Sequence, residues 1–89
     1  MRSIVYTGRF KKDLKRMIKQ GADKMLLHEV LITLQQGKPL DPKYDDHPLH
    51  GKLGGKRDCH ITPDWVLIYA IDKSDLILYR TGTHSDLFN

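Results

Sequence analysis

The segment from Lys56 to Gly82, KRDCHITPDWVLIYAIDKSDLILYRTG, decides the fold. It holds three stretches rich in β-branched and aromatic residues, at about Lys56–Ile61, Trp65–Ile71 and Leu76–Gly82. Two short polar turns, at residues 62–64 and 72–75, join these stretches. Because such tight links connect antiparallel neighbours, the segment predicts an antiparallel meander of three strands.

The residues before this segment predict a short strand and two helices. Arg2–Tyr6 is a strand candidate, and Thr7 can cap a helix that runs to about Gln20. The apolar residues of this helix share one face: Phe10, Leu14, Met17 and Ile18.

Asp23 can cap a second helix that ends near Gln36, with four residues on its buried face: Leu27, Val30, Leu31 and Leu34. The Gly21–Ala22 link makes the two helices an antiparallel hairpin. The predicted fold class is therefore α+β, with an N-terminal helical hairpin packed on one face of an antiparallel sheet.

Residues 38–55 are predicted to form a long loop. Three prolines and three glycines in this segment exclude a long helix or a central strand. Long loops in small domains are usually functional or disordered.

Length and composition favour one domain over residues 1–89 and a reducing compartment. A chain of 89 residues has room for a single core, and its only cysteine, Cys59, cannot form an internal disulfide. The sequence contains neither a signal-peptide h-region nor an apolar segment of membrane-spanning length. We expect a cytoplasmic protein without membrane contact.

Positive charge is concentrated near the N-terminus. Residues 1–20 contain seven Lys and Arg but only one acidic residue, Asp13, although the whole chain carries a net charge of +4. A basic segment of this kind is typical of polyanion binding, which assigns substrate contacts to Lys11, Lys12, Lys15 and Arg16. The alternative is an ordinary solvated helix face.

Four histidines of the C-terminal half lie outside the helical core stripes: His47, His50, His60 and His84. Asp64 follows His60 by four residues, across a turn built on Pro63. If the meander brings His60, His84 and Asp64 into one cleft, one imidazole can accept a proton while another donates one, since histidine titrates near about pH 6.5.

Such a pair can cleave RNA. A base takes the proton of the 2′-hydroxyl, which attacks the adjacent phosphorus, and an acid protonates the departing 5′-oxygen. Neither a metal nor a cofactor is required, because the nucleophile belongs to the RNA.

Other interpretations of the same residues stay open. The two histidines of His47-Pro48-Leu49-His50 have a spacing that could supply two ligands to zinc, but the sequence has no Cys pairs and no His-Glu-x-x-His helix. Asp64 could be a plain turn residue and Trp65 a core aromatic. Cys59 alternates with His60 along its strand, so we expect Cys59 to pack inward.

Three blocks of sequence resemble YafQ-type toxins of the RelE superfamily: Asp46–Gly51, Arg57–Trp65 and Arg80–Phe88. With the basic hairpin before them, the resemblance covers essentially the whole chain. It implies the toxin of a type II toxin–antitoxin pair, with an α+β RelE-like fold. It also implies a metal-independent endoribonuclease (mRNA interferase) that cuts mRNA on the ribosome and is neutralised by an antitoxin.

Carried over by position, the resemblance places the catalytic residues at His47, His60, Asp64 and His84. It adds Trp65 as a substrate contact or a brace, and Phe88 as a stacking platform for an unpaired base. We add Arg80 of the third block to the predicted substrate contacts. His50 is left out of the catalytic set.

Fold alone does not decide function, since gyrase-poisoning toxins share this superfamily. A second hypothesis is a non-catalytic nucleic-acid-binding module that acts with an antitoxin as a repressor on operator DNA. Cutting of RNA by the protein in the presence of a chelator separates the two hypotheses.

Overall fold

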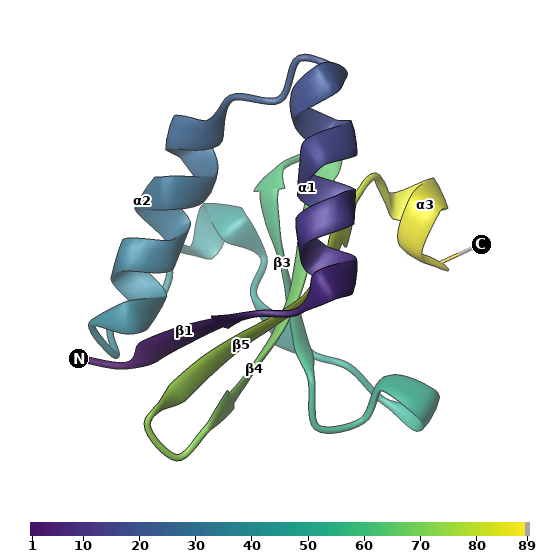
Figure 1. Cartoon of the computed structure of the whole chain (residues 1–89). Helices are drawn as coiled ribbons and strands as arrows, with labels where there is room; N and C mark the ends of the chain where they lie inside the picture. Colours follow the sequence, from purple (N-terminus) through teal and green to yellow (C-terminus); the bar gives the residue numbers. More distant parts are fainter. Residues whose placement is uncertain (89) are drawn as a thin grey trace.

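A five-stranded sheet in the order β1-β5-β4-β3-β2 forms the centre of the computed structural model, which describes residues 1–88 (Figure 1). Its strands are β1 (Ser3–Tyr6), β2 (His47–Pro48), β3 (Arg57–Thr62), β4 (Trp65–Asp72) and β5 (Asp75–Gly82). The predicted antiparallel meander is confirmed as β3-β4-β5.

Strand β1 makes the sheet mixed rather than purely antiparallel, because it pairs with β5 in parallel. The two strands are about seventy residues apart, and no local turn signal could indicate their pairing. β1 ends at Tyr6, opposite Leu78, so the edge of β5 beyond that point is left for other partners.

Two helices, α1 (Gly8–Lys19) and α2 (Lys24–Gln35), form the predicted hairpin and cover one face of the sheet (Figure 1). Both predicted N-caps are confirmed. The Thr7 hydroxyl accepts a hydrogen bond from the Phe10 N–H at 3.1 Å, and the Asp23 carboxylate accepts one from the Met25 N–H at 3.0 Å. No helix in residues 1–88 is long and apolar enough to cross a membrane.

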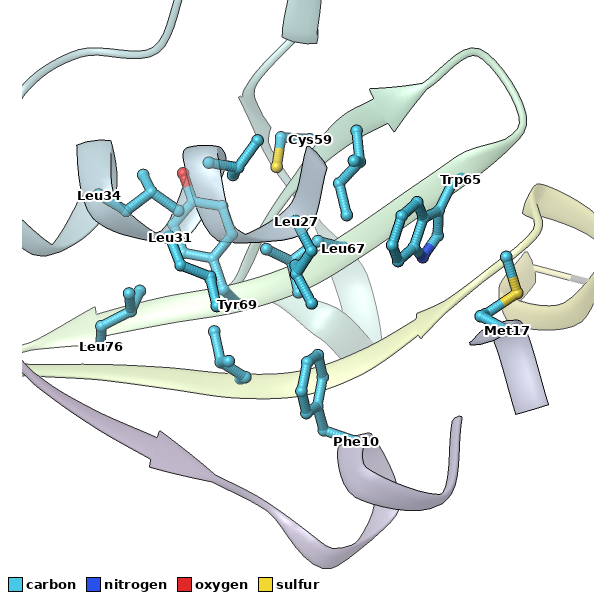
Figure 2. Close-up of a cluster of buried hydrophobic side chains, with 13 residues drawn as sticks. Phe10, Met17, Leu27, Leu31, Leu34, Cys59, Trp65, Leu67, Tyr69 and Leu76 are labelled. Carbon is cyan, nitrogen blue, oxygen red and sulfur yellow. The ribbon is translucent and has the colours of Figure 1, made fainter. Parts of the chain in front are cut away.

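The core lies between this hairpin and the alternate residues of the meander (Figure 2). From the sheet it receives Cys59, Ile61, Trp65, Leu67, Tyr69, Leu76 and Leu78. From the helices it receives Phe10, Met17, Leu27, Val30, Leu31 and Leu34. All four predicted α2 residues are buried, whereas Ile18 of the predicted α1 stripe is 37% exposed.

The predicted loop 38–55 carries short pieces of structure: η1 (Pro42–Tyr44), the edge strand β2 and η2 (Gly51–Leu53). Asp46 anchors this segment to the core. Its carboxylate accepts a hydrogen bond from the Tyr69 hydroxyl at 2.6 Å and two longer ones from the Arg57 guanidinium. The residue next to this anchor is His47.

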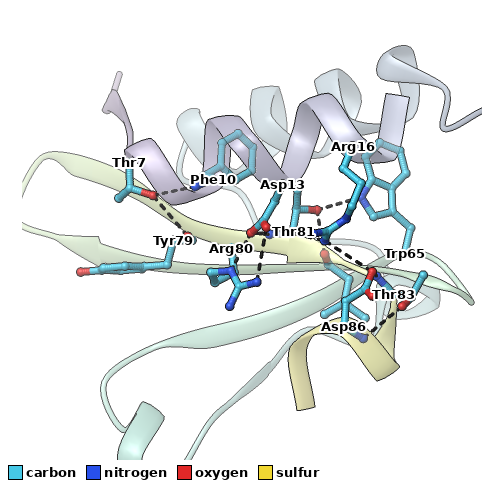
Figure 3. Close-up of polar contacts among 11 residues, drawn as sticks. Thr7, Phe10, Asp13, Arg16, Trp65, Tyr79, Arg80, Thr81, Thr83 and Asp86 are labelled. Atoms are coloured by element: carbon cyan, nitrogen blue, oxygen red, sulfur yellow. Dashed lines mark hydrogen bonds and ion pairs between the residues drawn. The ribbon is translucent and has the colours of Figure 1, made fainter. Parts of the chain in front are cut away.

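Asp13 is a buried charge on α1, only 3% exposed, in the stripe that was expected to be apolar (Figure 3). Its carboxylate reaches the edge of β5 past the end of β1. There it accepts hydrogen bonds from the Arg80 guanidinium at 2.6 and 3.3 Å and from the Thr81 N–H at 3.2 Å. α1 thus takes over the strand edge that β1 leaves free.

Asp13→Asn should lower the free energy of unfolding by about 1.5–3 kcal/mol, because hydrogen bonds to a charged partner are lost inside the protein. Urea unfolding measures the change, and Asp23→Asn is the control, since Asn caps a helix as well as Asp does. Equal stability of Asp13→Asn and wild type would show that this contact contributes nothing to the docking of α1.

Candidate active site on the face opposite the helices

The face of the sheet opposite α1 and α2, here called the site face, gathers residues that the sequence assigns to catalysis. On β3, Asp58 and His60 alternate with the core residues Cys59 and Ile61, so they point to the site face. His47 on β2 pairs directly with Asp58 and shares this face. Beneath them, Val66 and Ile68 of β4 are buried as well, and they give the site an apolar floor.

The His47 imidazole is held at both nitrogens. Nδ1 lies 2.7 Å from the Asp45 carbonyl oxygen, and Nε2 lies 3.2 Å from Asp58 Oδ1. A carbonyl can only accept, so Nδ1 carries a proton. Asp45 presents its carbonyl from a left-handed backbone conformation with φ of 49°, which aspartate tolerates better than most residues.

The contact between His47 Nε2 and Asp58 Oδ1 is close but is not an aligned hydrogen bond. A neutral His47 protonated at Nδ1 would turn the lone pair of Nε2 toward the carboxylate, and two acceptors would face each other. The conflict disappears when Nε2 or Asp58 holds one further proton. The pair therefore provides either an imidazolium beside a carboxylate or a neutral imidazole beside a carboxylic acid.

Asp58 is the most constrained member of this group. Its side chain is 4% exposed, and within residues 1–88 its buried Oδ1 accepts no aligned hydrogen bond. Burial raises the pKa of the Asp58 carboxyl, and the nearby His47 and His60 partly offset that rise. Carboxylates under such strain are typical of functional sites.

His60 and His84 extend the site on either side. The rings of His60 and His47 have their centroids 6.5 Å apart. His84 begins α3 (His84–Phe88), a short C-terminal helix, and its exposed ring packs on Phe88 with centroids 4.8 Å apart. Charges at His60 and His84 both act on Asp58. The structure thus brings His47 and His60 to one carboxylate, whereas His84 lies on α3 beside Phe88.

A second polar network fixes α3 (Figure 3). Thr83 and Asp86 cap the helix reciprocally, since each side chain accepts the other's N–H at 3.1 Å. These hydrogen bonds lower the pKa of the Asp86 carboxyl. Arg16 on α1 joins Asp86 at 3.4 Å and Asp13 at 3.6 Å.

The predicted substrate contacts therefore fall into two groups. Arg80 and Arg16 form ion pairs with acidic residues. Each therefore has a structural role, and the neighbouring carboxylate weakens its attraction for the phosphates of a ligand. Lys11, Lys12 and Lys15 are exposed on α1, and no ion pair within residues 1–88 holds them.

Trp65 is the clearest correction to the sequence-based assignment. It is 3% exposed in the core, and its indole N–H donates to the Thr81 hydroxyl at 2.7 Å. It therefore braces the site from below, and the predicted substrate contact is wrong for this conformation. Asp64 is exposed at the β3–β4 turn and lines a hollow with Thr83, and in the described part of the chain no ion pair joins it to a histidine.

The histidines do not form a metal centre in this arrangement. Among residues 1–88 no three His, Cys, Asp or Glu side chains lie close enough to hold one ion. Cys59 is fully buried, and burial raises the pKa of its thiol, so it packs as predicted and is no nucleophile.

Two important acidic residues were missed by the sequence-based prediction, although signals for both exist. Asp58 stands two residues before His60 on a predicted strand, so it had to share the face of His60. Asp13 is the only acid of the basic helix and lies within the Phe10–Met17 stripe.

Asp58→Asn should make the fold more stable at neutral pH and abolish most of the RNA cleavage expected from the sequence. Because the pKa of Asp58 is raised, ionisation of this group destabilises the folded state, and a neutral isostere avoids that cost. We therefore expect a higher Tm for Asp58→Asn than for wild type at neutral pH. Cleavage should fall by roughly 10²-fold or more.

The gain in Tm should shrink as the pH is lowered, since the wild-type carboxyl then takes up its proton more readily in the folded state. Thermal melts between acidic and neutral pH measure this trend. A variant that is less stable than wild type at neutral pH would contradict the burial of a strained carboxylate at this position.

Comparisons with known proteins identify the family of this chain. The family described as bacterial toxin of type II toxin-antitoxin system, YafQ, matches residues 2–89. The mRNA interferase toxin YafQ of Escherichia coli K12 is 41% identical over 88 residues, which are 98% of this chain and 96% of the relative.

Two solved structures have the same fold. A chain in the crystal structure of the E. coli DinJ–YafQ complex is 41% identical with a TM-score of 0.91, with 100% of both chains covered. A metal-bound toxin from Helicobacter pylori is 47% identical with a TM-score of 0.93, with 99% of this chain and 100% of that chain covered. The chain belongs to the YafQ family of bacterial toxins of type II toxin–antitoxin systems.

Proposed function

We propose that this toxin is an endoribonuclease, an mRNA interferase that cuts messenger RNA by attack of the RNA's own 2′-hydroxyl. The observation that carries the proposal is the pair of imidazoles, His47 and His60, beside the buried carboxylate of Asp58 on the site face. The name of the E. coli relative, mRNA interferase toxin, supports the same activity.

The chemistry needs a base, an acid and positive charge near the phosphorus. We assign proton transfer to His60 and His84, and each such group contributes about 10²–10⁴-fold to the rate. A His47 imidazole that is protonated at both nitrogens would supply positive charge beside Asp58, and this charge would stabilise the phosphorane. Arg80 adds charge at the same face.

Two further residues keep proposed roles around α3. Asp64 lines a hollow with Thr83, the residue before His84, which supports a role for Asp64 in orienting the His84 imidazole once RNA is bound. Phe88 packs on His84 and is half-buried, so its ring can stack on a base next to the scissile phosphate.

No metal is assigned to the reaction, because the nucleophile belongs to the RNA and the side chains supply the proton transfers. The H. pylori relative is described as metal-bound, but the imidazoles of this chain do not converge on one point. The proposed cleavage therefore proceeds in a chelator.

The proposed partners are an antitoxin, mRNA and the ribosome, in the cytoplasm where translation takes place. The E. coli relative forms a complex with DinJ, which supports a protein antitoxin for this chain. We propose that the antitoxin inhibits by covering the site face or by displacing α3, the element that carries His84 and Phe88.

His84→Ala should lower single-turnover cleavage in EDTA by about 10²–10⁴-fold, because proton transfer is lost. RNA binding should stay within a few-fold, and Tm should change little, since an exposed substitution usually stays within about 0.5 kcal/mol. Phe88→Ala should instead weaken substrate binding by roughly 1–3 kcal/mol. Wild-type cleavage by His84→Ala, or cleavage by wild type that requires added metal, would refute this mechanism.

The exposed lysines of α1 should bind phosphates rather than take part in chemistry. Replacing Lys11, Lys12 and Lys15 together by Gln should weaken RNA or ribosome binding and reduce the log–log salt slope by roughly 0.7 for each lost phosphate contact. Lys24→Gln, at the start of α2, is the control for charge alone. A slope that changes no more than in the control would mean that this helix face is merely solvated.

A further inference from the structure

A hollow on the site face continues the candidate active site toward the β4–β5 turn. It has a volume of about 350 Å³ and is lined by Gly54, Gly55, Lys56, Ala70, Ile71, Asp72, Ile77 and Tyr79. Its size falls within the about 300–1,000 Å³ common for small-ligand sites, which suits a single nucleotide.

The register of the sheet places this hollow beside the catalytic group. Lys56, Asp58 and His60 are spaced two residues apart, so they follow one another along one face. Lys56 lies about 7 Å from Asp58 along the strand direction, at about 3.3 Å per residue, and the next nucleotide of an RNA can span this step. On β5, Tyr79 is the direct neighbour of Arg80.

A β-bulge explains why two adjacent β5 residues serve the same face. The register with β4 shifts between Ile68 and Tyr69, so that Ile68 pairs with Arg80 while Tyr69 pairs with Leu78. Tyr79 is the extra residue. Successive side chains of a regular strand point to opposite faces of the sheet, and a bulge can redirect one of them. Bulges are frequent next to active sites.

The walls of the hollow offer a ring and a cation. The Lys56 Nζ lies 4.6 Å from the centroid of the half-buried Tyr79 ring. An aromatic ring stacks on any base, and an ammonium binds the adjoining phosphate. The negative charge of Asp72 repels a phosphate at its end of the hollow, so the phosphate should bind at the end formed by Lys56.

The glycines leave the rim open. A side chain added at Gly55 would meet no atom within 4 Å, and its φ of +84° favours glycine. RNA can therefore approach the backbone of residues 54–55 closely.

We propose that Tyr79 and Lys56 form a nucleotide subsite, in which Tyr79 stacks on a base next to the cleaved step and Lys56 holds its phosphate. This inference rests on the proposed RNase function. It adds to that function a pair of residues that positions the RNA strand along the site face. Phe88 and Tyr79 would then hold bases on opposite sides of the catalytic histidines.

The test combines protein variants with mRNAs in which single bases are removed. The cut position is first mapped with wild-type protein, on free RNA and on ribosome-bound mRNA. Cleavage is then measured at subsaturating protein in the format that wild type cuts, with an abasic nucleotide placed at each position near the cut. We expect one abasic position to lower wild-type kcat/KM by about 5- to 150-fold, the loss expected for one stacked base.

That penalty should disappear in Tyr79→Ala and persist in Tyr79→Phe, which keeps the ring. Phe88→Ala should remove the penalty at a different position. Lys56→Gln should reduce the salt slope by roughly 0.7. Thermal melts accompany each variant, and Tyr79→Leu replaces Tyr79→Ala if the latter does not fold.

The outcomes separate the two proposals. If wild type cuts RNA and Tyr79→Ala or Tyr79→Leu keeps the full wild-type pattern of abasic penalties, the subsite is wrong and the RNase function stands. If wild type cuts no RNA in either format, the proposed function fails and the subsite fails with it.

Discussion

The buried carboxylate of Asp13 is the contact on which the geometry of the site depends. β1 pairs with only the first half of β5, and Asp13 takes hydrogen bonds from Arg80 and Thr81 where that pairing has ended. Through Arg16 the same carboxylate is linked to Asp86, which caps the helix that carries His84 and Phe88. A single charge on the basic helix thus fixes a strand edge, an arginine of the site face and the C-terminal helix. A buried charge is tolerated only when it is paired, and this one has a guanidinium, a backbone N–H and a second arginine within reach.

The sheet separates stability from chemistry. Residues of one parity on β3 and β4 pack against the helices, where Cys59, Trp65, Leu67 and Tyr69 are almost fully buried. Residues of the other parity supply Asp58 and His60 over a floor of Val66 and Ile68. The site face is held from the core side as well, since Tyr69 donates to Asp46 next to His47 and Trp65 donates to Thr81 next to Gly82. Asp58 is the exception to this division, because it is buried and poorly hydrogen-bonded and lies beside His47, a proposed catalytic residue.

Much of this could be predicted from local sequence patterns. Both helices, both N-caps and the three-stranded meander follow from periodicity and turn residues, whereas the catalytic role of the histidines stays a prediction. Non-local facts could not be predicted in this way. The parallel pairing of β1 with β5 joins the two ends of the chain, and the ion pairs of Asp13 and Asp86 cross from α1 to β5 and α3. For Trp65 the sequence left a substrate contact and a core brace open, since a strand residue at a turn can point to either face until the register is known.

The most direct test of the central claim is to map where RNA touches the protein. A short mRNA with a 2′-O-methyl group at the cleaved nucleotide cannot be cut and can be titrated into labelled protein while backbone amide signals are followed by NMR. A site on the face opposite the helices predicts the largest shifts at Asp58, His60, Arg80 and His84, with smaller ones along α1. Shifts confined to the outer surface of α2, with the amides of β3 and α3 unchanged, would contradict the assignment of the site face to RNA.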